Sequence, residues 1–291
     1  MIIQLANAWC NVRISPHGAE LKSLQSVAAK QEYIWQADPA IWERSAPFLF
    51  PNVGRLKENT YFYQNKKYHL GQHGFLRDQD FQLVEHTENQ AVLQFESTEE
   101  TQKNYPFTFR TTVTYTLRDN TLVVAFTVKN LGDKKMYFSY GNHAGFCAPI
   151  NPDLTFEDYA IELLPHQRRK RIRLTKEKQS DLEHPLLEES NRIALTHEKF
   201  KKDALIYQTE GETQIRLYSD KDPRQLIVSY EGFSYVGIWS PYPTTGDFVC
   251  IQPWCGIADP IAATQQWTQK PASQELAANQ EFTREFRLTI D

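Results

Sequence analysis

The amino-acid sequence predicts an all-β protein, a large antiparallel β-sandwich with a few short helical turns. Two observations lead to this fold class. Apolar and polar residues alternate with a period of two over many short runs, and Gly, Pro, Asn and Asp separate these runs. Such alternation places one face of a strand on a core and the other face toward solvent or a cleft.

The clearest strands lie in the middle of the chain and at its end. Residues 107–117 carry mostly apolar side chains at odd positions and Thr or Arg at even positions. The alternation continues through residues 122–128, and Asp119-Asn120 between the two runs is typical of a tight hairpin turn. Residues 282–290 form the last expected strand, with Phe, Leu and Ile on one face.

Shorter segments complete the expected fold. Residues 39–44 and 99–104 are each predicted to form no more than a turn or two of helix, and the most polar stretch, residues 166–191, indicates an insertion or a long loop. No repeat of fixed period and no low-complexity linker interrupts the chain, so we predict one domain over residues 1–291. Further short strands are expected at residues 10–14, 61–63, 91–96, 136–140, 215–217, 226–230, 235–239 and 248–251.

The composition is that of a globular protein, with 41% hydrophobic and 23% charged residues. The formal net charge is −4 and the pI is near 6.1, so no broad basic field is present and a nucleic-acid partner is not expected. The four cysteines form no Cys-x-x-Cys pair, which favours a reducing compartment. Residues 1–7 lack a signal-like pattern and no apolar run is long enough to span a membrane, so we expect a soluble cytoplasmic protein.

Several common catalytic motifs are absent from the sequence. It contains no Gly-rich phosphate loop, no Gly-x-Ser-x-Gly and no His-Glu-x-x-His, which disfavours nucleotide hydrolysis, α/β-hydrolase chemistry and zinc-dependent proteolysis. The eight histidines are dispersed without a His-x-His pair. A metal site is therefore not expected.

Two histidines stand in segments rich in glycine. His73 lies in Gly-Gln-His-Gly-Phe, eighteen residues after Arg55, and His143 lies in Gly-Asn-His-Ala-Gly, directly after an expected strand. Glycine beside histidine lets the backbone approach a ligand closely. For each histidine alone, a structural role inside a loop is the alternative.

Aromatic and basic side chains offer two further candidates. Trp239 and Trp254 lie at expected strand ends beside turn residues, and flat aromatic faces next to polar groups suit sugar rings, with core packing as the alternative. Residues 166–171 are the only basic cluster. This cluster is either a solvated loop face or a contact for an anion, such as a phosphosugar or an acidic partner.

Four segments, taken in order, resemble the aldose 1-epimerase (galactose mutarotase-like) family, particularly its bacterial branch encoded near lactose and galactose genes. Residues 47–56 (PFLFPNVGRL) are similar to the family's Arg-bearing segment. Residues 72–77 (QHGFLR) and 141–146 (GNHAGF) are similar to its two histidine motifs. Residues 249–259 (VCIQPWCGIAD) are similar to the segment with the catalytic carboxylate, and the resemblance covers nearly the whole chain.

The resemblance implies a galactose mutarotase-like supersandwich with a sugar cleft on one sheet, and interconversion of the α and β anomers of an aldohexose. The pyranose ring opens when its ring oxygen is protonated and a base takes the proton of the C1 hydroxyl. Rotation about the C1–C2 bond and reclosure then give the other anomer, without a metal or cofactor. By this likeness His143 is the general acid and His73 hydrogen-bonds near the ring oxygen. The residues expected to contact the sugar are Arg55, Asn142, Asp203 and Trp239.

One position departs from the family pattern in a way that bears on catalysis. Gln252 stands where the family has the Glu of Glu-Pro-Trp, and an amide can bind a hydroxyl but cannot accept its proton. A positioned acid–base group contributes about 10²–10⁴-fold to a rate. Gln252 therefore predicts slow catalysis or none. Ala144 also replaces the proline that usually follows the second histidine, which bears on the substrate range.

Three hypotheses remain open at this point. The first is an active epimerase in which Asp247, Asp259, Glu231 or a bound water replaces the missing base. The second is a sugar-binding relative with little or no turnover. The third is an epimerase of hexose 6-phosphates, in which the segment near Arg168 contacts the phosphate.

Overall fold

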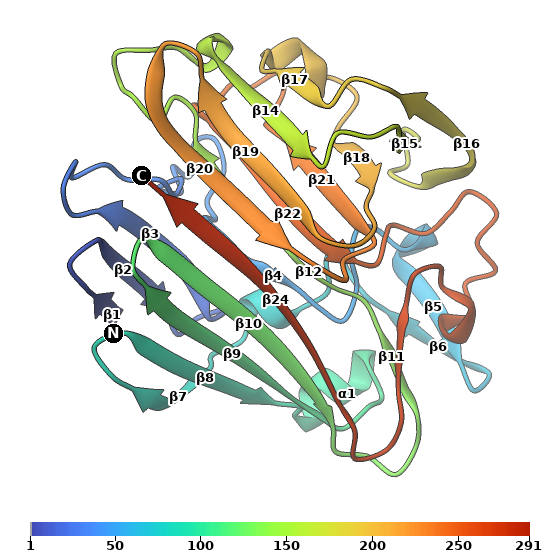
Figure 1. Ribbon diagram of the computed structural model, residues 1–291. Coiled ribbons are helices and arrows are strands. Elements are labelled where there is room, and N and C mark those ends of the chain that lie inside the picture. The colour runs from blue at the N-terminus through green and yellow to red at the C-terminus, as the bar shows by residue number, and fades with distance from the viewer. Residues whose placement is uncertain (1) are drawn as a thin grey trace.

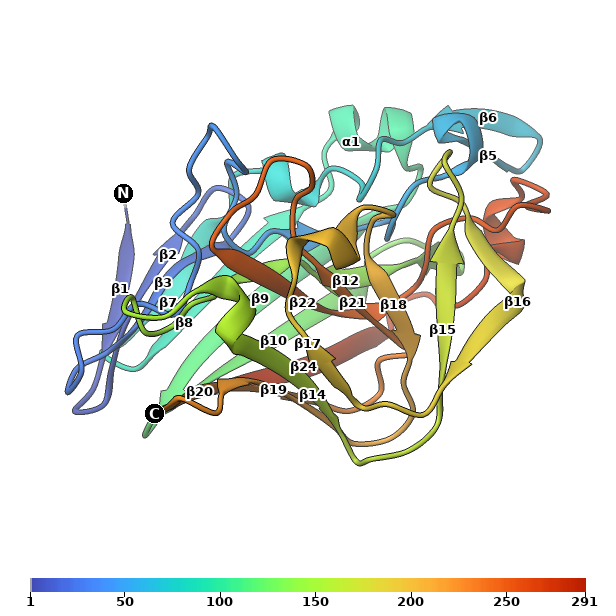
Figure 2. The ribbon, with the colours of Figure 1, turned by 90° about the horizontal axis from the view of Figure 1, so that it is seen from above.

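The computed structural model describes residues 2–291, and its strands form two large sheets stacked one behind the other (Figures 1 and 2). Strands hold 51% of the residues and helices 8%, and the paired strands are antiparallel. The predicted all-β sandwich is therefore confirmed.

The larger sheet has nine strands, in the order β17-β14-β19-β20-β24-β10-β9-β8-β7. The predicted turn at Asp119-Asn120 is confirmed, because it joins β9 to β10 with Arg118 opposite Thr121. The C-terminal strand lies inside the sheet and pairs with β10 and β20 (Figure 1). The strands are β7 (Gln82–His86), β8 (Gln90–Glu96), β9 (Phe109–Arg118), β10 (Thr121–Asn130), β14 (Tyr159–Leu164), β17 (Arg192–Ala194), β19 (Thr213–Ser219), β20 (Asp222–Tyr230) and β24 (Glu281–Ile290).

The second sheet has eight strands, in the order β16-β15-β18-β21-β22-β12-β4, with β13 also paired to β22. β22 lies in its interior, between β21 on one side and β12 and β13 on the other. The strands are β4 (Phe48–Leu49), β12 (Tyr140–Asn142), β13 (Ala144–Cys147), β15 (Arg169–Leu174), β16 (Ser180–Glu188), β18 (Leu205–Gln208), β21 (Tyr235–Trp239) and β22 (Phe248–Cys255).

Smaller elements flank the two sheets. The predicted helix at residues 99–104 is confirmed as α1 (Glu99–Asn104), which begins with a capping box between Thr98 and Thr101. Within residues 2–291, no helix is long and apolar enough to cross a membrane. The remaining strands are β1 (Ile3–Ala6), β2 (Cys10–Ser15), β3 (Glu20–Ser26), β5 (Thr60–Tyr63), β6 (Lys66–His69), β11 (Met136–Phe138) and β23 (Gln274–Leu276), and 3-10 turns cover Lys57–Asn59, Leu76–Asp78, Phe156–Asp158, His197–Phe200 and Trp267–Gln269.

The main core fills the space between the two sheets. Phe126 on β10 stacks on Tyr140 on β12, with ring centroids 4.0 Å apart and an interplanar angle of 4°. Phe48 on β4 stacks on both rings, with its centroid 5.6 Å from that of Phe126 and 6.4 Å from that of Tyr140. Full burial of each such ring contributes about 1.5–3 kcal/mol, so these contacts fix the separation and the relative position of the sheets.

The expectation of a long loop at residues 166–191 was wrong. These residues form the antiparallel pair β15 and β16 at the edge of the eight-stranded sheet. Charged side chains hid the strand pattern: Arg171 pairs with Glu188 and Arg173 with Asp181 across the hairpin. Charge is typical of edge strands, because it discourages pairing with another chain.

The expected strand at residues 136–140 is divided between two sheets. β11 pairs with β23, whereas β12 enters the eight-stranded sheet. Residues 39–44 form a single turn, in which the N–H of Trp42 donates to the carbonyl of Asp38 at 2.8 Å.

Candidate active site

β22 builds the floor of a cavity of about 580 Å³. Successive residues of a strand point to opposite faces. Ile251 therefore belongs to the core between the sheets, whereas Gln252 and Trp254 line the cavity. The cavity lies on the outer face of the eight-stranded sheet. Its polar lining residues are Arg55, Gln72, His73, Arg77, His143, Lys178, Lys201, Asp203, Thr244 and Gln252.

Gln252 is held in the middle of the sheet, opposite Gly237 of β21, and only 1% of its surface is exposed. Its Oε1 atom accepts no hydrogen bond from the residues that the structure describes. A buried amide oxygen without a partner costs about 1–3 kcal/mol. A ligand hydroxyl that donates to Oε1 would remove this cost, so the amide favours a polyhydroxylated ligand.

His143 lies between β12 and β13, where its backbone N–H donates to the carbonyl of Pro47 at 2.9 Å. Its ring packs 5.0 Å from the ring of Trp42 and 5.6 Å from that of Trp239. Burial lowers the pKa of His143 to about 3. The imidazole is therefore neutral at pH 7 and carries one N–H and one lone pair.

His73 is fixed by reciprocal hydrogen bonds with Gly54. The N–H of Gly54 donates to Nδ1 of His73 at 3.1 Å, and the N–H of His73 donates to the carbonyl of Gly54 at 2.9 Å. Burial lowers the pKa of His73 well below its usual range, and the neighbouring His143 and the positive charge of Arg77 lower it further. Because Nδ1 accepts, the neutral ring carries its proton on Nε2. His73 is thus a hydrogen-bond donor at Nε2. The amide nitrogen of Gln72, 3.2 Å from Nε2, is also a donor and cannot accept this proton.

The two imidazoles meet edge to face, with ring centroids 5.5 Å apart. Arg55 lines the same cavity, and its guanidinium lies 3.4 Å from Oε1 of Gln72. Gly54, just before Arg55, has φ +73°, and a Cβ there would lie 2.6 Å from Cβ of Ala258. Only glycine combines this φ with so close an approach, so Gly54 fixes the loop that carries Arg55.

Asp203 is the one carboxylate that lines the cavity within residues 2–291. It follows the 3-10 turn His197–Phe200 and forms an ion pair with Lys178. Its charge raises the pKa of His143, whereas the charges of Arg77 and Arg44 lower it. The carboxylate therefore partly offsets a positive electrostatic field in the cavity.

Aromatic rings form one wall of the cavity. Trp42 and Trp239 meet edge to face at 5.8 Å, and Trp42 stacks on Phe248 at 5.5 Å. These rings leave flat apolar surface beside polar groups, an arrangement that suits the C–H face of a pyranose.

Trp254 lies across the glycines of the two neighbouring strands. A Cβ at Gly141 on β12 would lie 2.4 Å from Cδ1 of the indole, and a Cβ at Gly237 on β21 would lie 2.5 Å from Cη2. The two glycines therefore provide the space for a flat indole on the cavity floor. Its Nε1–H is buried and has no hydrogen-bond partner among the described residues.

Six of the seven residues expected at the site line this cavity: Arg55, His73, His143, Asp203, Trp239 and Gln252. Asn142 does not, because it is buried and its Nδ2 donates to the carbonyl of Ala46 at 3.2 Å. Sequence reasoning missed Trp42, Arg77 and Lys178. Arg77 could have been found, since it lies in the segment of residues 72–77 that carries His73.

The three carboxylates considered as substitutes for the missing base do not line the cavity. Asp247 and Glu231 are exposed elsewhere, and Asp259 is paired with Lys270 in the interior. Arg168 also lies outside the cavity lining, so the expected phosphate contact of the basic cluster is not supported. No group of three or more His, Cys, Asp or Glu side chains in the described part of the chain is placed to hold a metal ion.

Comparison with known proteins identifies the family. The family model described as Aldose 1-epimerase matches residues 1–289. The X-ray structure of a galactose mutarotase related enzyme from Lactobacillus acidophilus has 40% sequence identity and a TM-score of 0.97, with 100% of this chain and 97% of that chain covered. A galactose mutarotase-like protein from Lactobacillus casei ATCC 334 has 28% identity and a TM-score of 0.92, with both chains fully covered.

The chain is also similar over its full length to a curated protein. Protein LacX, chromosomal, from Lactococcus lactis subsp. lactis is 28% identical over 303 residues, covering 100% of this chain and 99% of the relative. The fold, the two histidine segments and the match over residues 1–289 agree, and the chain belongs to the aldose 1-epimerase family.

Proposed function

We propose that this protein interconverts the α and β anomers of an aldohexose by acid–base ring opening. The observation that carries the proposal is that His73 and His143, with ring centroids 5.5 Å apart, line one cavity together with Arg55. Family membership and the mutarotase-like structures support the reaction class.

We assign the proton transfers chiefly to His143. Its neutral ring accepts the proton of the C1 hydroxyl, the O1 electron pair forms the C1 carbonyl, and the bond from C1 to the ring oxygen breaks. The imidazolium then returns the proton to the ring oxygen, so atoms and charge balance. Nε2–H of His73 and the guanidinium of Arg55 donate to the oxygens on which negative charge develops.

Turnover is expected to be slow. A pKa of about 3 makes His143 a weak base, and Gln252 can only donate or accept a hydrogen bond. The amide positions the sugar and leaves His143 to move the proton alone. A carboxylate at position 252 would accept the proton and would also raise the pKa of both histidines through its charge.

Polarimetry tests the proposal directly. Freshly dissolved α-D-glucose and α-D-galactose should mutarotate faster with the protein than without it, in proportion to protein concentration. His143→Ala should lose this excess while keeping the melting temperature within a few degrees. If neither sugar shows an excess over the spontaneous rate, the proposed activity is wrong for these substrates.

A sugar-binding protein with little turnover is the second candidate. The observation in its favour is that the one lining carboxylate within residues 2–291, Asp203, is already paired with Lys178. Calorimetry with D-galactose and D-glucose should then show saturable binding that Arg55→Ala weakens, without any gain in mutarotation. A measured rate excess would reject this candidate.

A hexose 6-phosphate is a third possibility, on different residues from those first expected. Arg55, Arg77, Lys178 and Lys201 line the cavity together with one carboxylate from the described part of the chain, Asp203, so these side chains carry excess positive charge. D-glucose 6-phosphate should then be preferred over D-glucose, and the preference should fall as salt is raised. Equal rates for the two sugars would exclude this substrate class.

A further inference from the structure

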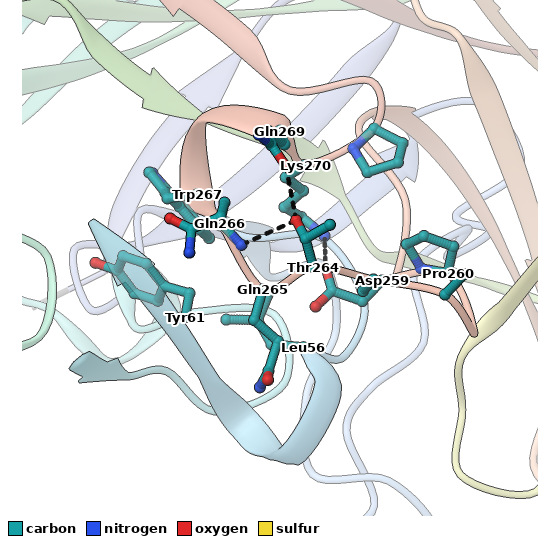
Figure 3. Close-up of a pocket in the computed structure, with 13 residues that line it drawn as sticks. Leu56, Tyr61, Asp259, Pro260, Thr264, Gln265, Gln266, Trp267, Gln269 and Lys270 are labelled. Carbon is teal, nitrogen blue, oxygen red and sulfur yellow. Dashed lines mark hydrogen bonds and ion pairs between the residues drawn. The ribbon is translucent and has the colours of Figure 1, made fainter. Parts of the chain in front are cut away.

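A buried ion pair lies behind the loop that carries Arg55. Nζ of Lys270 lies 2.9 Å from Oδ1 of Asp259 and also donates to the carbonyl of Ile257 at 2.8 Å. The side chains of Lys270 and Asp259 are 2% and 5% exposed. The two residues line a second cavity of about 220 Å³, which shares no lining residue with the cavity lined by Arg55, His73 and His143 (the sugar cavity). Figure 3 shows both side chains among the other residues that line this second cavity.

Asp259 contacts the backbone at Arg55 and at Lys57, two residues further along. Its N–H donates to the carbonyl of Arg55 at 3.0 Å. Its Oδ2 accepts from the N–H of Lys57 at 3.0 Å. One residue therefore fixes the chain directly at and just after Arg55, while His73 and Ala258 fix Gly54 just before it.

We propose that Asp259, held by Lys270, is a positioning residue that sets the place of the Arg55 guanidinium in the sugar cavity. The inference rests on the proposed function, because it concerns how Arg55 meets the sugar. Lys270 binds Oδ1 of Asp259, and Oδ2 of the same carboxylate then faces the N–H of Lys57.

The cost of the pair supports a role of this kind. Removing two charges from water is expensive, and apolar residues of similar volume often stabilise a fold as well or better. Each charge of the pair is compensated by the other and by hydrogen bonds instead of by water. The carboxylate of Asp259 is thereby held in one orientation beside Lys57, in the loop that carries Arg55. A group that binds a developing charge must be placed within about half an ångström, which a rigid support can provide.

The experiment compares two double variants that both lack the ion pair. Asp259→Asn/Lys270→Gln keeps an oxygen for the N–H of Lys57, whereas Asp259→Ala/Lys270→Gln removes it. Each is made with Arg55 present and in an Arg55→Ala background. Calorimetry measures D-galactose and D-glucose binding, polarimetry measures mutarotation, and hydrogen exchange reports protection of the Lys57 amide.

With Arg55 present, the alanine double variant should lose about ten- to a hundredfold in sugar affinity or mutarotation, and the asparagine double variant should retain most of it. In the Arg55→Ala background the two should be equal, because the guanidinium they position is gone. The Lys57 amide should exchange faster only in the alanine double variants.

Other outcomes overturn the inference or the proposed function separately. Equal losses in both backgrounds would show that Asp259 acts on the fold alone. If Arg55→Ala by itself changes neither binding nor mutarotation of either sugar, the proposed function fails, while the amide exchange still tests the contact. Should the alanine double variant not fold, Lys57→Pro removes the same N–H at the first position of a 3-10 turn, where proline is tolerated, and should cause the same loss.

Discussion

The indole of Trp254 occupies the space that a Cβ atom at Gly237 would need, with Cη2 only 2.5 Å from that position. The two residues lie on neighbouring strands, β22 and β21. The absence of a side chain on one strand thus sets the position of an aromatic ring on the next.

Gly237→Ala should displace the Trp254 indole and weaken sugar binding by tenfold or more. Overpacking at a rigid backbone position costs about 1–3 kcal/mol, so the free energy of unfolding should fall by a similar amount. Calorimetry and urea unfolding measure the two effects. Gly71→Ala is the control, because a Cβ there meets no atom within 4 Å. Unchanged affinity in Gly237→Ala would show that the indole does not contact the sugar.

Gln252→Glu should raise the mutarotation rate by about 10²–10⁴-fold, because it supplies the carboxylate that can take the C1 hydroxyl proton. Polarimetry on fresh α-D-galactose measures the gain. Gln252→Met keeps the length of the side chain without a proton acceptor and should not accelerate the reaction. No gain in a folded Gln252→Glu protein would mean that position 252 is not the base position.

Trp239→Ala should weaken sugar binding by about tenfold, because it removes one ring of the aromatic wall against which His143 packs. Trp9→Ala is the matched control, since Trp9 is 58% exposed and lies outside the cavity lining. Calorimetry on both variants gives the comparison. Equal affinities would place the sugar away from this wall.

The free energy of unfolding should decrease as the pH falls from about 6.5 toward 3, because the pKa of His143 differs between the folded and the unfolded chain. The pKa of His143 is lowered from 6.5 to about 3, so between these values the unfolded chain binds a proton that the folded chain does not. The resulting loss is about 3 kcal/mol at pH 4 relative to pH 7. Urea unfolding at both pH values should show a smaller difference in His143→Asn. An identical difference would contradict the buried, neutral state of His143.

Most of the fold could be predicted from the sequence because the strands carry their pattern locally. Residues 107–117 alternate regularly, since one face of β9 packs on the core and the other is solvated. The strands β15 and β16 were missed because they lie at a sheet edge, where charged pairs replace the apolar alternation. The apolar cluster to which Ile172 of β15 belongs includes Leu49 and Trp254, which are distant in the sequence.

Site residues that lie in a sequence motif could be predicted. Residues whose role depends on the direction of the side chain, or that reach the site from a distant part of the sequence, could not. His143 lines the cavity, and its neighbour Asn142 points to the opposite side because successive strand residues alternate. Trp42 lies in a turn about a hundred residues before His143 and reaches it only through the tertiary fold. The single domain over residues 1–291 stays a prediction, with residue 1 outside the described residues.

All eight residues of β22 are buried, with one side of the strand in the interior and the other on the floor of the cavity. Substitutions at Ile251 that would seem to concern folding alone should also shift the adjacent amide and change ligand preference. Laboratory diversification of specificity should therefore begin with the surrounding loops, such as the turn bearing Trp42, where changes in recognition are least constrained by the interior.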